Sequence, residues 1–178
     1  MNELQFPIGK YTPNKIPTEQ QLSDWLNSIA SFPEKVAELT KDASIEAINW
    51  QYRPKGWTVK QVIHHCADSH MNSIIRFKLA LTEEAPTIRP YFEDRWAELH
   101  DSLDDDLHDV LQLLQGLHNK WVVLLKSISA EQMQREYVHP EHGQRFNIAE
   151  TIGSYAWHCE HHLAHIKNGL SSNGKFTN

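Results

Sequence analysis

The stretch that decides the fold is NIAETIGSYAWHCEHHLAHI, residues 147–166. It opens with Asn147 and, three positions later, Glu150, which is the signature of a capped helix start. Apolar residues then recur at the three- and four-residue spacing of a helix that buries one face. These residues are Ile148, Ile152, Tyr155, Ala156, Cys159, Leu163 and Ile166. The pattern predicts one long amphipathic helix near the carboxyl end of the chain.

Three other stretches predict helices of the same kind. Two of them open with cap pairs, Thr18 with Gln21 and Thr58 with Gln61. The first predicted helix contains Pro33, which is expected to kink or restart it, and the second covers about 59–81. The third follows the acidic run at 104–106, which suits the positive end of a helix dipole. Four long amphipathic helices predict an all-α fold, a four-helix bundle.

The segments between these helices carry weaker patterns. Residues 1–17 hold three prolines and a glycine, and we expect an irregular leader. The connection over 82–103 is long for a compact domain, and such connections are often functional. Residues 135–146 predict a small hairpin or loop. With 178 residues in all, the chain is expected to form a single domain over 1–178.

Composition argues against several classes of function. The net charge is −6 and lysine and arginine do not cluster, so the chain lacks the positive surface that binds nucleic acid. No apolar run approaches the roughly 20 residues that span a bilayer. The first residues, MNELQFPIGKYTPNK, do not form a signal peptide. Two cysteines do not make a disulfide framework. We therefore expect a cytoplasmic protein that binds neither nucleic acid nor membrane.

Histidine is the unusual residue, with 12 in the chain, and most of them fall in two groups. One group is His64, His65 and His70, and the other is His158, His161, His162 and His165. His161 and His165 are four residues apart, so their side chains leave one face of a helix a turn apart and can reach the same ion. A third ligand is needed, and His64–His65 on the second predicted helix is the other source. An isolated helical histidine is usually solvated or hydrogen-bonded, but two dense groups favour a metal site.

Three neutral imidazoles suit a borderline divalent ion such as zinc or nickel. Coordination positions left to water are typical of a catalytic rather than a structural site. Helices of a bundle commonly hold such sites between them, in the core. The two groups of histidines thus predict a metal site between two helices.

The sequence resembles the DinB/YfiT-like family over nearly its whole length, and in particular the YfiT branch. The similar stretches are 6–9, 56–59, 64–73, 76–84, 89–91 and 157–166, among them HHCADSHMNS at 64–73 and HHLAHI at 161–166. The resemblance implies a bundle of up-down-down-up topology, a homodimer, and one zinc or nickel ion per chain. It implies three ligands, His65, His161 and His165. Glu160 departs from the family pattern, which has a further histidine there.

For the residues near the expected ligands, a purely structural role is an alternative to a functional one. Cys66 and Cys159 lie beside expected ligands but fall on the apolar stripes, so we expect buried small hydrophobes. Asp68 either accepts a hydrogen bond from a ligand imidazole or serves as a surface cap or ion pair. The other nearby histidines either line the cavity or face solvent, and two lie in the hairpin. They are His64, His158, His162, His139 and His142.

The resemblance also implies an activity, that of a metal-dependent hydrolase or of a thiol S-transferase using bacillithiol or a similar small thiol. In either case the ion would act as a Lewis acid on a bound water or thiol. The partner is then a small-molecule substrate. The alternative is a non-catalytic metal-binding module of the stress response, which predicts a site closed by protein ligands. The sequence assigns no catalytic residue beyond the metal ligands.

Overall fold

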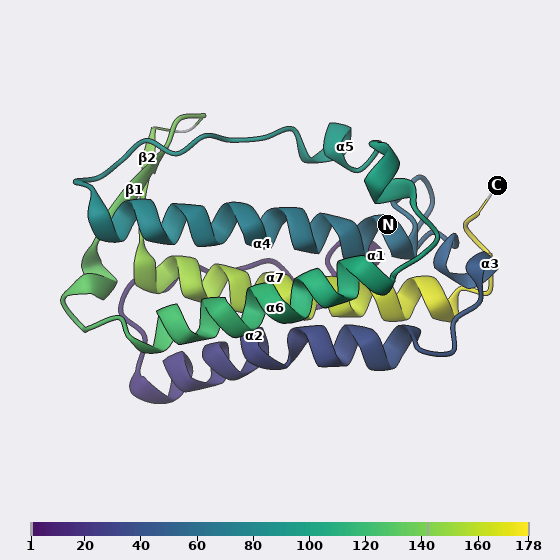
Figure 1. Cartoon of the computed structure of the whole chain (residues 1–178), viewed down its shortest axis with the longest axis horizontal. Coiled ribbons are helices and arrows are strands. Elements are labelled where there is room, and N and C mark those ends of the chain that lie inside the picture. The colour runs from purple at the N-terminus through teal and green to yellow at the C-terminus, as the bar shows by residue number, and fades with distance from the viewer. Residues whose placement is uncertain (1, 142, 178) are drawn as a thin grey trace.

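The computed structural model describes residues 2–141 and 143–177 (Figure 1). Four long helices dominate the described part. They are α2 (Glu19–Thr40), α4 (Val59–Thr82), α6 (His108–Lys126) and α7 (Ile148–Ser171). The short elements are α1 (Asn2–Gln5), α3 (Ile45–Ile48), α5 (Glu93–Trp96), η1 (His100–Leu103), η2 (Gln132–Gln134), β1 (Glu136–His139) and β2 (Gln144–Asn147). The predicted helical bundle is confirmed.

The helix starts follow from local side-chain chemistry. The side chains of Thr18, Thr58 and Asn147 each accept a hydrogen bond from the backbone N–H three residues on. The glutamine or glutamate at that position accepts one in return from the backbone N–H of the cap residue. Each exchange satisfies backbone donors that a helix start otherwise leaves unpaired. Helix α2 continues through Pro33, whose side chain is buried. The helix therefore does not restart at Pro33, which was one of the two outcomes expected from the sequence.

The bundle has up-down-down-up topology. In Figure 1, α2 and α7 run in one direction along the long axis, whereas α4 and α6 run in the other. Helix α2 packs on α7 and α6, and α4 packs on the same two helices. Because α4 and α6 are parallel neighbours, the chain must return along the whole bundle between them. The long connection after α4 makes that return and carries α5 and η1 (Figure 1).

The parts outside the long helices correct one prediction and confirm another. The leader is not wholly irregular, because it contains the short helix α1. The segment at 135–146 does form a hairpin, in which β1 pairs with β2 in antiparallel register from Glu136 opposite Asn147 to His139 opposite Gln144. The fold is thus helical with one small two-stranded sheet. Among the described helices, none is long and apolar enough to cross a membrane.

The core lies between the four long helices and is rich in aromatic side chains. Phe32, Phe77 and Trp121 are among its largest fully buried members. Two imidazoles, those of His70 and His118, are also completely buried there. A buried polar ring requires hydrogen-bond partners, and these partners lead to the functional site.

Candidate metal centre

Helices α4 and α7 each form one wall of a cavity of about 410 Å³. His65 of α4 and His161 and His165 of α7, the three predicted ligands, all line it. His158 and His162 line it as well. Five imidazoles from two antiparallel helices therefore face one space.

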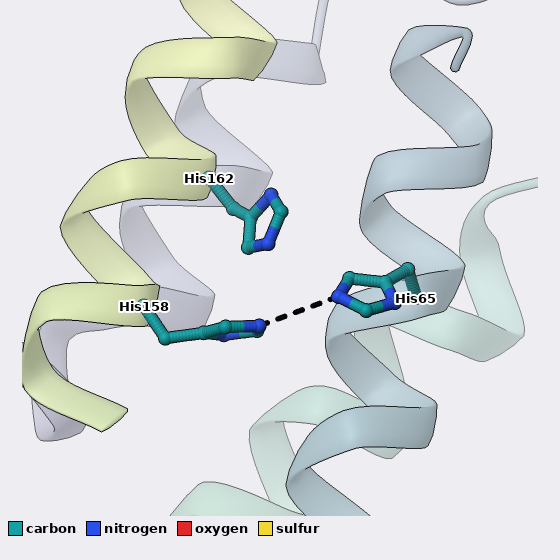
Figure 2. Close-up of side chains that lie close together, drawn as sticks. All are labelled: His65, His158 and His162. Atoms are coloured by element: carbon teal, nitrogen blue, oxygen red, sulfur yellow. Dashed lines mark hydrogen bonds between the residues drawn. The ribbon is translucent and has the colours of Figure 1, made fainter. Parts of the chain in front are cut away.

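The predicted three ligands are not among the sets of described residues whose ligand atoms lie within 4.8 Å of one another. Ring nitrogens of His65, His158 and His162 lie within 4.8 Å of one another, and the imidazole of His65 points from α4 toward the other two on α7 (Figure 2). The Nε2 atoms of His65 and His158 are 3.3 Å apart. His158 and His162 share the four-residue spacing of His161 and His165. That spacing was the signal in the sequence that would have included them.

His161 and His165 lie next to each other, with ring centroids 4.2 Å apart. His165 Nε2 donates to the backbone carbonyl of Gln5 at 3.2 Å, and its Nδ1 lies 3.3 Å from His162 Nδ1. His161 Nδ1 is buried and has no hydrogen-bond partner within the described part of the chain. A buried nitrogen without a hydrogen-bond partner fits the role of a metal ligand.

Aromatic rings hold these two imidazoles in place. Trp157 stacks on His161 with ring centroids 4.3 Å apart, and Tyr52 stacks on His165 at 3.9 Å. Stacking of this kind restricts the rotation of each imidazole. The orientation of the two histidines is thus set before any ion binds.

Burial keeps the predicted ligands neutral. It lowers the pKa of His65 to about 4, with a smaller effect from neighbouring His161, and it lowers that of His161 to about 4. Burial, followed by the proximity of His161, lowers the pKa of His165 to about 3. A neutral imidazole is the form that binds a metal ion. All three therefore offer lone pairs at neutral pH.

A chain of buried imidazoles runs from the core to this cavity. His118 Nδ1 lies 2.7 Å from the carbonyl oxygen of Ile29, and His118 Nε2 lies 2.8 Å from His70 Nδ1. His70 Nε2 lies 3.1 Å from His158 Nδ1. The carbonyl can only accept, so in neutral rings each Nδ1 of the chain donates and each Nε2 accepts. His158 Nε2 therefore ends the chain as an acceptor that faces His65.

This arrangement provides a test of whether the residues fit a metal ion. In the absence of an ion, neutral His65 meets this acceptor by donating its Nε2 proton to His158 Nε2, and an ion bound at His65 Nε2 would take the place of that proton. The donor set consists of neutral nitrogens, the kind that zinc and nickel prefer. The residues fit a divalent ion.

A second group of possible ligands, Cys66, His70 and His158, belongs to the core instead. Burial raises the pKa of the Cys66 thiol well above its usual range, so the thiolate that binds metals is disfavoured. Both nitrogens of His70 already have partners. Cys66 and Cys159 are fully buried, as small hydrophobic residues are.

The remaining candidates contribute less. Asp68 makes no side-chain hydrogen bond to an imidazole among the described residues; burial, then Asp101, raises its pKa to about 6. The alternative in which Asp68 orients a ligand is therefore unsupported. His64 is half-buried and absent from the cavity wall. His139 lines a neighbouring, larger cavity, and His142 lies outside the described residues.

The fold and the site together define a class, a four-helix bundle protein with a histidine-lined centre between antiparallel helices. Comparison with known proteins agrees with that definition. The profile of the DinB superfamily matches residues 29–166. The chain belongs to this superfamily.

Relatives from Bacillus are similar over almost the whole chain. Proteins from Bacillus cereus strain 03BB102 and Bacillus thuringiensis subsp. konkukian strain 97-27, both named "Putative metal-dependent hydrolase", are each 47% identical over 167 residues, which is 93% of this chain and 95% of theirs. The solved structure of YfiT from Bacillus subtilis superimposes with a TM-score of 0.92 at 41% identity, covering 98% of this chain and 99% of that one. It is described as "a probable metal-dependent hydrolase with an unusual four-helix bundle topology". The resemblance to the YfiT branch is thereby confirmed.

Proposed function

We propose that this chain is a metal-dependent hydrolase in which His65, His161 and His165 hold one divalent ion, zinc or nickel. The observation that carries the proposal is the convergence of neutral imidazoles from α4 and α7 on one cavity. The names of the Bacillus relatives support the reaction class. The orphaned Nδ1 of His161 supports its place in the ligand set.

A bound divalent ion supplies Lewis acidity, which lets a water or thiol lose its proton near neutral pH. The chain supplies the rest of the site. Trp157 and Tyr52 hold the imidazoles of His161 and His165 in orientation. His158 Nε2, the acceptor end of the buried imidazole chain, faces His65 and helps to orient its imidazole.

The proposed reaction is tested by assaying zinc-loaded protein on simple ester and amide substrates, with and without cysteine, glutathione or bacillithiol. Hydrolysis without a thiol, abolished by chelation and restored by zinc, is the expected result. His161→Ala should reduce the rate to that of the uncatalysed reaction. His108→Ala, at an exposed histidine of α6, should leave the rate unchanged.

Three other results would change the assignment. Acceleration that requires a thiol would move the protein to the S-transferases. Equal rates before and after chelation would contradict metal dependence. No turnover, together with an ion enclosed entirely by protein ligands, would favour the non-catalytic binding module.

A further inference from the structure

A larger cavity of about 620 Å³ adjoins the histidine-lined one. It lies among α4, α7, the hairpin and the segment around α5, and it shares Glu93, Asp94 and His158 with its neighbour. Its volume is within the usual range for pockets that bind small molecules. A substrate reacting at the histidines thus has room to extend into this space.

Arg76 is the unusual residue in the wall of this larger cavity. Its side chain is half-buried and makes no ion pair within the described part of the chain. Its Nε is sealed from solvent without a hydrogen-bond partner, and Nη1 makes only a long bond of 3.5 Å to the hydroxyl of Tyr155. A guanidinium carries five donors. A partly buried cation with so few partners is costly unless an anion joins it.

We propose that Arg76 binds a carboxylate of the substrate, at a subsite remote from the reacting bond. The inference rests on the proposed function, since it places the other end of the same substrate at the histidines. Arginine is well suited to this role, because its planar fork matches the two oxygens of a carboxylate. The substrate class is therefore a small molecule that carries a negative charge away from the bond to be cleaved.

A second donor lies beside Arg76. The Tyr137 hydroxyl lies 3.4 Å from Thr151 Oγ1, whose single proton goes to the Asn147 carbonyl at 2.7 Å. The Tyr137 O–H is therefore a donor, either to Thr151 or to an anion in the cavity. Burial raises the pKa of Tyr137 to about 12, with a smaller lowering effect from its bond with Thr151 and from Arg76, so the hydroxyl stays protonated. Both groups line the cavity. Together they offer a cation and a neutral donor to one ligand.

The acids of the cavity limit the charge of the ligand. Arg95 is a second cation of the lining, but four acids, Glu93, Asp94, Glu141 and Glu150, line the cavity as well. Burial, then Asp94 and Glu141, raises the pKa of Glu93. These groups repel a dianion more strongly than a monoanion. A carboxylate is therefore favoured over a phosphate.

The two subsites are connected along α4 and α7. Arg76 follows His65 by eleven residues on the same helix, which separates their backbones by about 16 Å along its axis. Tyr155, which contacts Arg76, lies against His158 with ring centroids 5.6 Å apart. The substrate is thus extended, with its carboxylate remote from the reacting group.

Binding of short probes tests the subsite without turnover. Hexanoate, hexanamide and hexyl phosphate are titrated calorimetrically into zinc-loaded protein. Hexanoate should bind at least ten times more tightly than the other two. Equal binding of hexanamide would overturn the proposal without any variant, and tighter binding of hexyl phosphate would overturn the choice of carboxylate.

Variants locate the bound probe. Arg76→Gln should weaken hexanoate binding at least tenfold, and Arg76→Lys should weaken it less. Lys78→Gln, at an exposed cation of the same helix outside the cavity, is the matched control and should change nothing. Two results would place the carboxylate elsewhere and overturn the proposal. One is tight hexanoate binding by folded Arg76→Gln protein, and the other is loss of hexanoate binding when zinc is removed from the unmodified protein.

The outcome is distinct from that of the proposed function. If esters and amides are not hydrolysed but hexanoate binding depends on Arg76, the subsite stands and the reaction class fails. If hydrolysis requires zinc but hexanoate binding does not depend on Arg76, the proposed function stands and the carboxylate subsite fails.

Discussion

At the scale of one residue, His161 shows the properties of the centre most clearly. The ring is fixed by stacking on Trp157, and Nδ1 is buried without a partner among the described residues. Its neighbour His165, in contrast, uses Nε2 to bind the Gln5 carbonyl. The leader of the chain thus reaches the site directly. A fixed, neutral and unpartnered nitrogen is what an ion-binding side chain requires.

Removal of this imidazole should empty the site. His161→Ala is expected to reduce the metal content of the purified protein to background, because two remaining ligands bind a divalent ion weakly. Elemental analysis measures it, with His108→Ala as the control that retains full metal. Full metal in His161→Ala together with loss in His162→Ala would instead assign the ion to His65, His158 and His162, whose ring nitrogens lie within 4.8 Å of one another.

His118 does not line the cavity of the metal centre, but its hydrogen bond orients His70 and, through His70, the cavity-lining His158. His118→Leu leaves the Ile29 carbonyl and His70 Nδ1 without their partner in the core. We expect the free energy of unfolding at pH 7 to fall by about 1–3 kcal/mol, the usual cost of an unsatisfied buried polar group. Urea denaturation measures it. His108→Leu on the exposed face of the same helix should stay within about 0.5 kcal/mol, and an equal effect of both changes would contradict the role given to His118.

At the scale of the element, helix starts were predictable and the centre was predictable only in part. A capping box is local chemistry, so Thr58 and Asn147 mark helix starts in any fold. The role of His158 is not local, because its Nδ1 depends on His70 of α4 and, through it, on His118 of α6. Spacing alone placed His158 either in the cavity or in solvent. The helix α1 was missed because four residues have little helical preference without the protein they pack on.

Close packing of α7 against α4 depends on a glycine. A Cβ built at Gly169 would lie 2.5 Å from Val59 Cγ2, whereas one at Gly116 in α6 meets nothing within 4 Å. Gly116→Ala should stabilise the protein by about 1 kcal/mol through helix propensity. Gly169→Ala should be destabilising by about 1 kcal/mol or more, because overpacking a stiff valine exceeds that gain.

Urea denaturation of the two variants compares these effects directly. Opposite signs are expected relative to the unmodified chain. Stabilisation of similar size at both positions would show that α7 and α4 are not in the close contact described.

At the scale of the whole molecule, the topology makes the long connection necessary. Parallel neighbours α4 and α6 need a return of the chain over the bundle, and that return brings α5 with Glu93 and Asp94 to the cavities (Figure 1). The sequence indicated a long functional connection but not where it lies. The homodimer implied by the resemblance stays a prediction, which light scattering would check against the monomer mass of 20.7 kDa.

The buried histidines make stability depend on pH. Burial lowers the pKa of His118 to about 4, as it does for His65 and His161, whereas in the unfolded chain the value is about 6.5. Between these values the unfolded state binds more protons, so the free energy of unfolding falls as pH is lowered from about 6.5 toward 4. Each such histidine adds a slope of about 1.4 kcal/mol per pH unit.

Urea denaturation of metal-free protein at pH 7 and pH 5 measures this dependence. The unmodified chain should lose stability at pH 5, and His118→Leu should lose less, because it lacks one of the groups concerned. Stability that is unchanged between the two pH values would contradict the burial of neutral imidazoles.

Anomalous diffraction from zinc-loaded crystals tests most directly whether the cavity between α4 and α7 is a metal centre. We expect one strong peak per chain in that cavity, at about 2.0–2.1 Å from a nitrogen of each of His65, His161 and His165. A peak on His65, His158 and His162 would contradict the ligand set, and the absence of any peak in the cavity would contradict the metal centre itself.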